Sequence, residues 1–508
     1  MRRVLPVVIG FLLWELFARL SGQGVLITGP TAIGVHLYQN AGLLARASLE
    51  TTQNAAWGIV WGNLVAVVLA MLVTLIPRSA RAVGSLSLLV FCLPLVATGP
   101  ILRVLYGPGN GPQITLAALA VFYTTFLSLR IGLRAIPQAW GDLVRLYGRG
   151  PWTMLWLIRM RAALPYLFVG LQIAAPAAFL GAMIGEFTGA ERGLGVLTLR
   201  AMRGLDVDAT WSLAVIAAAV SILTYAAVGR LAKAVIGYAP VVLLTPPRAS
   251  VRNVWWKQMT ELVLVVLAVL TIWQFGMDAF GLSSFFAKRP ADVWAYLAQP
   301  DPRATLLAAF GETLMMTIPG YLAGLALGVV TATVLVLRPA LSHGVLPLAV
   351  ALRAVPIITT APLIVLALGR GAAGTITIIA VMIFFPTLVA CLQGLRQTPG
   401  QIVDVFNSYG AGRIRLLLSA QIPAMLPAFF ASARMAVPAA LLAVTTAEWL
   451  ATGKGIGVLM ALTASTSNYN MLWSCVALLS LAAVAGYAVV AWIERVVLRI
   501  YASEQVTG

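Results

Sequence analysis

The sequence predicts an all-α, polytopic membrane protein made of two copies of one transmembrane half. Of its 508 residues, 61% are hydrophobic and only 10% are charged, and the mean hydropathy is +0.94. A soluble domain carries about 25% charged residues, so this composition is typical of a protein in a bilayer. The apolar runs at 211–227 and 476–490 do not alternate with polar residues. Because lipid offers no hydrogen bonds to the backbone, such runs must be helices and not barrel strands.

A constant offset of 262 residues relates the two halves of the chain. Tyr147–Gly148 recurs as Tyr409–Gly410. The same offset joins Glu50–Thr51 to Glu312–Thr313, Pro94 to Pro356, Pro176 to Pro438, Glu186 to Glu448, and Gly193 and Gly195 to Gly455 and Gly457. Composition alone does not produce an ungapped register of this length, so the sequence indicates duplication and fusion.

Each half is predicted to contain six membrane spans, which gives about 12 transmembrane helices of about 20 residues each. The spans are expected near 4–20, 51–76, 84–105, 113–135, 163–187 and 209–237, and near 259–280, 313–337, 345–368, 373–395, 425–449 and 471–498. The predicted domains are 1–240 and 259–508, joined by a cytoplasmic linker at 241–258. The first apolar segment is interpreted as a retained span and not a signal peptide, because no small-residue cleavage site follows it.

Basic residues gather in alternate loops of this topology. Examples on one side are Arg78, Arg134, Arg145, Arg338 and Arg396. The positive-inside rule then places both termini in the cytoplasm. The net charge of +18 follows from this topology, so a nucleic-acid partner is not expected.

The residues that commonly carry chemistry are few and scattered. Cys92, Cys391 and Cys475 have no metal-binding spacing, and His36 and His343 are isolated. No nucleophile–base pair is apparent either. The sequence therefore predicts neither a metal site nor an enzyme.

A polar loop between the fourth and fifth spans is unusually long in both halves, at 137–161 and 399–423. Leu143, Leu146 and Tyr147 lie at helical spacing before a Gly–Arg–Gly–Pro break, and a second apolar stretch follows it. This pattern predicts two short helices at the membrane surface. They could simply anchor the loop, but their recurrence in both halves favours docking to a partner with two-fold symmetry.

This loop resembles the signature of binding-protein-dependent ABC importer permeases. That signature has Glu-Ala-Ala, three residues, Gly, and then a stretch ending in Ile/Leu-Pro. Gly148 and Gly410 occupy the glycine position, and Asp142 and Asp404 occupy the acidic position. This chain departs from the pattern at the two alanines, which are Leu143–Val144 and Val405–Phe406, and at Met160–Arg161, which lacks the proline kept by Ile422–Pro423.

Two further segments resemble the nitrate, sulfonate and taurine subgroup of that family. One is Ile184–Gly185–Glu186 followed by Gly193–Leu194–Gly195, with its second copy around Glu448. The other runs from Leu352 to Leu363. The resemblance implies a fold of two tandem six-helix type I ABC-permease (MetI-like) domains, and an imported solute that is a small anion, a sulfonate or another small organic molecule.

The resemblance also implies the partners. Two ABC ATPase subunits would dock on the coupling loops, and an extracytoplasmic solute-binding protein would deliver the solute. The chain has no phosphate-binding G-x-x-x-x-G-K-[ST] segment, so ATP and Mg²⁺ are expected in the ATPase and no cofactor in this chain. Asp142, Gly148, Asp404 and Gly410 are expected at the ATPase contact, where the acid would cap the first short helix or pair with a basic residue of the partner.

A second set of residues is expected along the translocation path or at its gate, with the two glutamates and their Gly-x-Gly loops at the outer gate. It comprises Glu186, Gly193, Gly195, Glu448, Gly455, Gly457, Pro94 and Pro356. Both glutamates fall near the outer end of a predicted span, where the negative end of the helix dipole disfavours a carboxylate. Either the two acids shape the gate through their charge, or each one holds its Gly-x-Gly turn rigid by hydrogen bonds to backbone amides.

A secondary transporter of the major facilitator type is the alternative to an ABC permease, because it also contains two parallel six-span repeats. That class carries an acidic residue in a basic loop between its second and third spans, and none is present at 76–81. Acids in the middle of the spans, which ion-coupled carriers need, are also scarce.

Overall fold

The computed structural model describes residues 5–20, 28–136, 138–204, 206–237, 255–279, 281–342, 344–345, 357–369 and 371–501. Within these ranges every regular element is a helix. Eight of the helices are long and apolar enough to cross a membrane, or nine if a bent pair is counted as one span. The predicted class, an all-α polytopic membrane protein, is confirmed.

The two halves contain similar elements in the same order. The first half has α1 (Leu5–Leu20), α2 (Pro30–Gln39), α3 (Ala41–Leu75), η1 (Pro77–Ser79), α4 (Ala80–Phe91), α5 (Leu95–Tyr106), α6 (Gly111–Arg134), α7 (Gln138–Leu146), α8 (Pro151–Thr153), η2 (Met154–Arg159), α9 (Met160–Phe187), α10 (Leu194–Arg203) and α11 (Val207–Ile236). The second has α12 (Trp255–Ala279), α13 (Pro290–Leu297), α14 (Pro300–Leu337), η3 (Pro339–Leu341), α16 (Ile357–Leu368), α17 (Ala372–Arg396), α18 (Gly400–Ser408), α19 (Arg413–Leu416), η4 (Leu417–Gln421), α20 (Ile422–Ala447), η5 (Glu448–Thr452), α21 (Ile456–Ser465) and α22 (Tyr469–Tyr501).

The third predicted span of the first half is broken. The segment ending at α4 and the helix α5 are bent by 91° at a short break, so 84–105 is not one straight helix as the sequence suggested. Pro94 is buried at this break and forms the N-cap of α5. A proline there removes a backbone donor and clashes with the preceding turn, which explains why the helix stops. The matching Pro356 lies outside the described residues.

The second span of each half is much longer than a bilayer requires. α3 has 35 residues and α14 has 38, so at 1.5 Å per residue they are about 50–57 Å long, against a hydrocarbon core of about 30 Å. Both begin ten or more residues before the predicted spans. Glycines bring them close to their neighbours: a Cβ on Gly58 would lie 2.3 Å from that of Ala117 in α6. Such small residues are what allow membrane helices to pack tightly.

The two halves share their buried core. Ala97 and Ile101 of α5 belong to the same buried cluster as Ala440 and Val444 of α20. In the other direction, Trp449 of the second half packs against the core of the first. The broken third span thus brings first-half residues into the second-half core, and the halves form one body.

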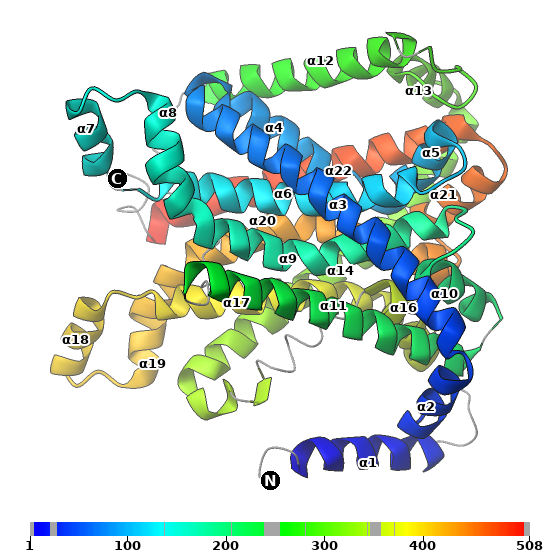
Figure 1. The fold of residues 1–508 in the computed structure, drawn as a ribbon, viewed down its shortest axis with the longest axis horizontal. Coiled ribbons are helices and arrows are strands. Elements are labelled where there is room, and N and C mark those ends of the chain that lie inside the picture. Colours follow the sequence, from blue (N-terminus) through cyan, green and yellow to red (C-terminus); the bar gives the residue numbers. More distant parts are fainter. Residues whose placement is uncertain are drawn as a thin grey trace.

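The bundle has two distinct ends (Figure 1). The pairs α7–α8 and α18–α19 project from one end, where α22 also ends. The short helices α10, α13 and α21 lie at the opposite end. The helices α1 and α12 run along the outer edges of the bundle. The end of the last described helix, α22, therefore lies on the same side as α7 and α18.

Candidate functional site

A buried carboxylate organises the end of the first half where α10 lies. Glu186, near the end of α9, is only 1% exposed. Its Oε1 accepts a hydrogen bond from the Thr51 hydroxyl at 2.7 Å, and its Oε2 accepts one from the Gly195 N–H at 2.6 Å. The Thr51 hydroxyl in turn accepts a bond from the Leu194 N–H at 2.9 Å. Two free N–H groups at the start of α10 are thereby satisfied, and negative charge is favourable at that helix end.

The second half repeats this arrangement atom for atom. Glu448 accepts bonds from the Thr313 hydroxyl at 2.8 Å and from the Gly457 N–H at 2.8 Å. The Thr313 hydroxyl accepts a bond from the Ile456 N–H at 2.9 Å. Every partner is displaced by 262 residues from its first-half equivalent. We call each arrangement a Thr–Glu–Gly unit, made of Thr51, Glu186 and the turn 193–195, or of Thr313, Glu448 and the turn 455–457.

The first glycine of each turn is required by the geometry. Gly193 has φ +126° and Gly455 has φ +91°. A Cβ on Gly193 would lie 2.2 Å from the Glu186 Cδ, and one on Gly455 would lie 2.1 Å from the Glu448 Oε1. No other residue combines this backbone conformation with this close approach.

In both units the glutamate accepts a hydrogen bond from a backbone amide of its Gly-x-Gly turn. This is the bond expected if the glutamate holds the turn rigid, the alternative to a role of its charge in the gate. The unfavourable helix dipole at the end of the fifth span, which was expected to act on each carboxylate, is only one of the interactions at this site. The carboxylates of Glu186 and Glu448 reach across to the N-terminal ends of α10 and α21 and bind donors there. Their place at the outer gate remains a prediction.

Sequence reasoning did not assign Thr51 and Thr313 to a site. Both had been matched in the 262-residue register as the second member of a Glu–Thr pair. A hydroxyl that recurs at the first residue of both predicted second spans was the signal that could have identified them. Their role needed the tertiary structure, because 135 residues separate each threonine from its glutamate.

The two coupling elements at the other end of the bundle also match each other. The Gly148 N–H donates to the Arg145 carbonyl and the Arg149 N–H to the Val144 carbonyl, and Gly410 and Ala411 donate to Asn407 and Phe406 in the same way. Gly148 has φ +65° and Gly410 has φ +64°. This pair of bonds with a left-handed glycine is the Schellman motif, which ends a helix sharply.

The acidic residues of the coupling elements do not cap helices. Asp142 lies inside α7 and Asp404 inside α18, so the capping interpretation is wrong. Asp142 instead lies 3.6 Å from Arg145 in a pair whose side chains are both largely exposed. Such exposed pairs contribute little stability. Both carboxylates are therefore available at the surface.

Apolar side chains are unusually exposed on these projections. In α7 and its turn they are Trp140, Leu143, Leu146 and Tyr147, and in α18 and its turn they are Ile402, Val405 and Tyr409. The two tyrosines that precede the glycines are 76% and 85% exposed. Exposed apolar side chains gathered on a projecting element indicate an interaction surface.

The second short surface helix predicted in each loop is not separate. The chain is continuously helical from Pro151 to Phe187 and from Arg413 to Leu450, with a π-helical stretch inside each. No glycine or proline interrupts it between Pro151 and Pro165. Each projection is therefore one short helix, a glycine turn and the extended beginning of the fifth span.

The fold and its two ends define a multi-pass membrane transport component. The family described as "Binding-protein-dependent transport system inner membrane component" matches residues 62–237 and 324–499. Together these segments cover more than half of the chain, and their bounds differ by the same 262 residues. The chain belongs to this family and carries its domain twice. The major facilitator alternative finds no support.

Three relatives each resemble roughly half of the chain. A probable ABC transporter permease protein of Haemophilus influenzae is 30% identical over 43% of this chain and 90% of its own length. The formylaminopyrimidine transport permease protein of Halalkalibacterium halodurans is 25% identical over 47% and 96%. The riboflavin transport system permease protein of Chloroflexus aurantiacus is 25% identical over 52% and 98%. Further matches include a putative aliphatic sulfonates transport permease protein and a taurine transport system permease protein of Escherichia coli and a nitrate import permease protein of Synechococcus elongatus. Each of the three corresponds in length to one half of this chain.

Proposed function

We propose that this one chain forms the whole membrane-spanning part of an ATP-driven importer. Two ATPase subunits dock on the α7 and α18 projections, and a solute-binding protein delivers a small solute at the opposite end. The observation that carries this proposal is the pair of matching helix–turn projections at one end of a two-copy bundle.

The projections have the chemistry of a docking element. Each presents exposed aromatic and aliphatic side chains beside a solvent-exposed acid. Aromatic residues near the centre of an interface commonly dominate its binding energy. Two copies on one rigid body suit a partner that is itself a symmetric pair. ATP and Mg²⁺ would bind in that partner, because this chain has no phosphate-binding loop.

Orientation follows from the arginines around the projections. Arg134, Arg145 and Arg149 lie in or beside α7. The positive-inside rule assigns this end to the cytoplasm and the α10–α21 end to the outside of the bacterial inner membrane. A cysteine placed at Tyr147 should react with an impermeant reagent only when the cytoplasmic side of oriented vesicles is open.

The Thr–Glu–Gly units would then shape the outer gate. Each ties the loop after the fifth span to the second span of the same half. A rigid turn at the point of delivery would lower the entropy cost of binding a partner. We infer that the imported solute is a small anion, a sulfonate or another small organic molecule, in keeping with the names of the relatives.

Reconstituted transport tests this function. The chain, its ATPase and its binding protein would be combined in proteoliposomes with ATP inside, and uptake of labelled solute would be followed. We expect ATP hydrolysis to rise when the solute-loaded binding protein is added, together with uptake. Uptake that follows an ion gradient without ATP would contradict the proposal.

A further inference from the structure

A cavity of about 480 Å³ opens beside the Thr–Glu–Gly unit of the first half. Arg46 and Glu50 line it from the extended start of α3, and Arg192 and Arg200 line it from the turn and helix α10. A neighbouring cavity of about 240 Å³ shares Glu50 and Arg192 with it. We call these two adjacent cavities together the first-half pocket.

Positive charge is in excess in this pocket, and much of it is unpaired. Arg46, Arg192 and Arg200 are exposed. None of these three side chains has a hydrogen-bond or ion-pair partner among the described residues. One of the two acids, Glu50, accepts a bond from Asn110 at 2.7 Å. The guanidinium groups are thus free to bind carboxylates, for which their planar fork is well suited.

The second half lacks this pocket chemistry. The 262-residue offset places Ala308 at the position of Arg46 and Leu462 at that of Arg200. Only Lys454, at the position of Arg192, keeps a positive charge. Glu312 also differs from Glu50, because it accepts a bond from the Gly455 N–H at 3.0 Å and so belongs to its own turn.

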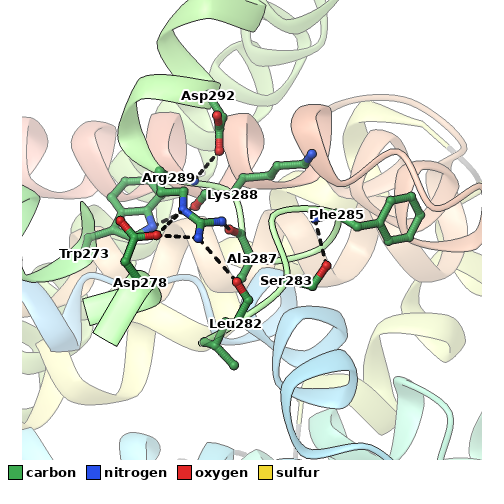
Figure 2. A network of polar contacts seen from close by, with 9 residues as sticks. All are labelled: Trp273, Asp278, Leu282, Ser283, Phe285, Ala287, Lys288, Arg289 and Asp292. Atoms are coloured by element: carbon green, nitrogen blue, oxygen red, sulfur yellow. Dashed lines mark hydrogen bonds and ion pairs between the residues drawn. The ribbon is translucent and has the colours of Figure 1, made fainter. Parts of the chain in front are cut away.

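Two arginines lie at this end of the second half, Arg289 before α13 and the exposed Arg303 in the first turn of α14, and Arg289 is already engaged. The Arg289 guanidinium donates to the Asp278 carboxylate at 2.9 Å and to the carbonyls of Ala287 and Leu282, as Figure 2 shows. Its backbone N–H donates to Asp292. Arg289 therefore fastens the α12–α13 connection and has little charge left for a partner. The two halves, alike in backbone, present different charges at the same end.

We propose that the first-half pocket receives acidic side chains of the solute-binding protein and fixes a single orientation of that protein on the permease. This rests on the proposed function. A single binding protein placed on a two-fold repeated surface could dock in two orientations. Only one of them brings its acidic side chains to Arg46, Arg192 and Arg200, so the charge difference between the halves selects it.

A protein partner suits this pocket better than a free small anion. The lining mixes both charge signs, since Glu50 and Glu191 lie among the arginines. Exposed Leu43 and Leu49 add apolar surface at the edge. Protein interfaces are enriched in arginine and combine apolar surface with polar and charged groups. A free anion would meet the two carboxylates without gaining from the apolar part.

Charge reversal in the pocket tests the proposal. The variant carrying R46E, R192E and R200E would be assembled with the ATPase in nanodiscs, and its affinity for the solute-loaded binding protein measured at several salt concentrations. We expect affinity to fall by about tenfold or more, with a weaker salt dependence, as for the loss of steering charges. ATP hydrolysis without binding protein should not change, which also shows that the variant is folded.

The matched control is K454E in the second half, which we expect to change the affinity by less than about twofold. Unchanged affinity in the triple variant would overturn the proposal, and so would an equal loss in K454E. Sodium acetate, added without binding protein, tests the other source of carboxylate. If acetate raises ATP hydrolysis in the wild type but not in the triple variant, the pocket binds free anions and the proposal is wrong. If the binding protein fails to bind the wild type at all, the proposed function itself fails.

Discussion

The Glu186 carboxylate accepts a hydrogen bond from the Thr51 hydroxyl at 2.7 Å, across 135 residues of sequence. Glu448 and Thr313 form the same contact at 2.8 Å across the same separation. Each contact joins the fifth span to the second span of one half and holds the start of the following short helix. The duplicated chain has kept this contact in both copies, while the charged side chains around it differ.

The charge of these glutamates can be separated from their hydrogen bonds. In E186Q and E448Q the amide oxygen can still accept from the turn, and the amide nitrogen can donate to the threonine oxygen. We expect this double variant to keep its unfolding temperature and its uptake. E186A, in contrast, leaves the buried Gly195 N–H without an acceptor, at a cost of about 1–3 kcal/mol. Thermal unfolding in detergent and uptake in vesicles are the measurements. Loss of uptake in a stable glutamine variant would show that the charge itself acts at the gate.

The glycines of the turns should not tolerate a methyl group. G193A must hold φ near +126° and place a Cβ 2.2 Å from the glutamate. The backbone conformation alone costs about 1–3 kcal/mol, and the clash adds to it. G42A is the control, because a Cβ there meets nothing within 4 Å on an exposed part of α3. We expect the unfolding temperature of G193A to be lower than that of the wild type and the unfolding temperature of G42A not to decrease. Equal unfolding temperatures would show that the turn is looser than described.

Bulky residues at Gly148 and Gly410 should uncouple ATP hydrolysis from transport. A Cβ at either position meets nothing within 4 Å, so a large side chain would project from the turn toward the partner. The left-handed conformation costs a non-glycine residue about 1–2 kcal/mol, and less for asparagine. We expect G148W with G410W to fold but to lose uptake, while the asparagine pair retains most of it. Normal uptake in the tryptophan pair would place the ATPase elsewhere.

An ion pair in the second half is replaced by uncharged residues at the equivalent positions of the first half, so its contribution to stability can be tested by exchanging those residues. The Arg434 Nη1 lies 2.9 Å from the Glu494 Oε2, with the side chains 21% and 13% exposed. At the equivalent positions the first half has Gln172 and Ala232. E494A leaves the guanidinium without its counter-charge, which costs about 3–5 kcal/mol for a fully buried pair and less here. We expect R434Q with E494A, which restores the first-half residues, to recover most of the unfolding temperature. A double variant as unstable as E494A would contradict this.

Hydrophobic runs and the repeat were sufficient to predict the class of fold, because long apolar helices and a constant register are local signals. The broken helix at Pro94 was not predicted, since the hydrophobicity on both sides of the break is continuous. The helices α10 and α21 were also missed, because both have only 10 residues and are too short to be identified as spans. Asp142 was misassigned as a cap because its helix begins at Gln138, a boundary that the sequence does not mark clearly.

The site was only partly predictable for a similar reason. The register identified Glu186, Glu448 and the glycines, because identical residues recurred at one offset. It could not show that Thr51 lies against Glu186, which depends on how the second and fifth spans pack. Nor could it show the charge difference between the halves, since that depends on which side chains gather around one cavity.

The stoichiometry of the intact complex tests the central claim most directly. If this chain alone supplies both permease domains, native mass spectrometry of the transporter should give one copy of the chain with two ATPase subunits. Two copies of the chain in each complex would contradict the account, because each copy would then use only part of its duplicated structure.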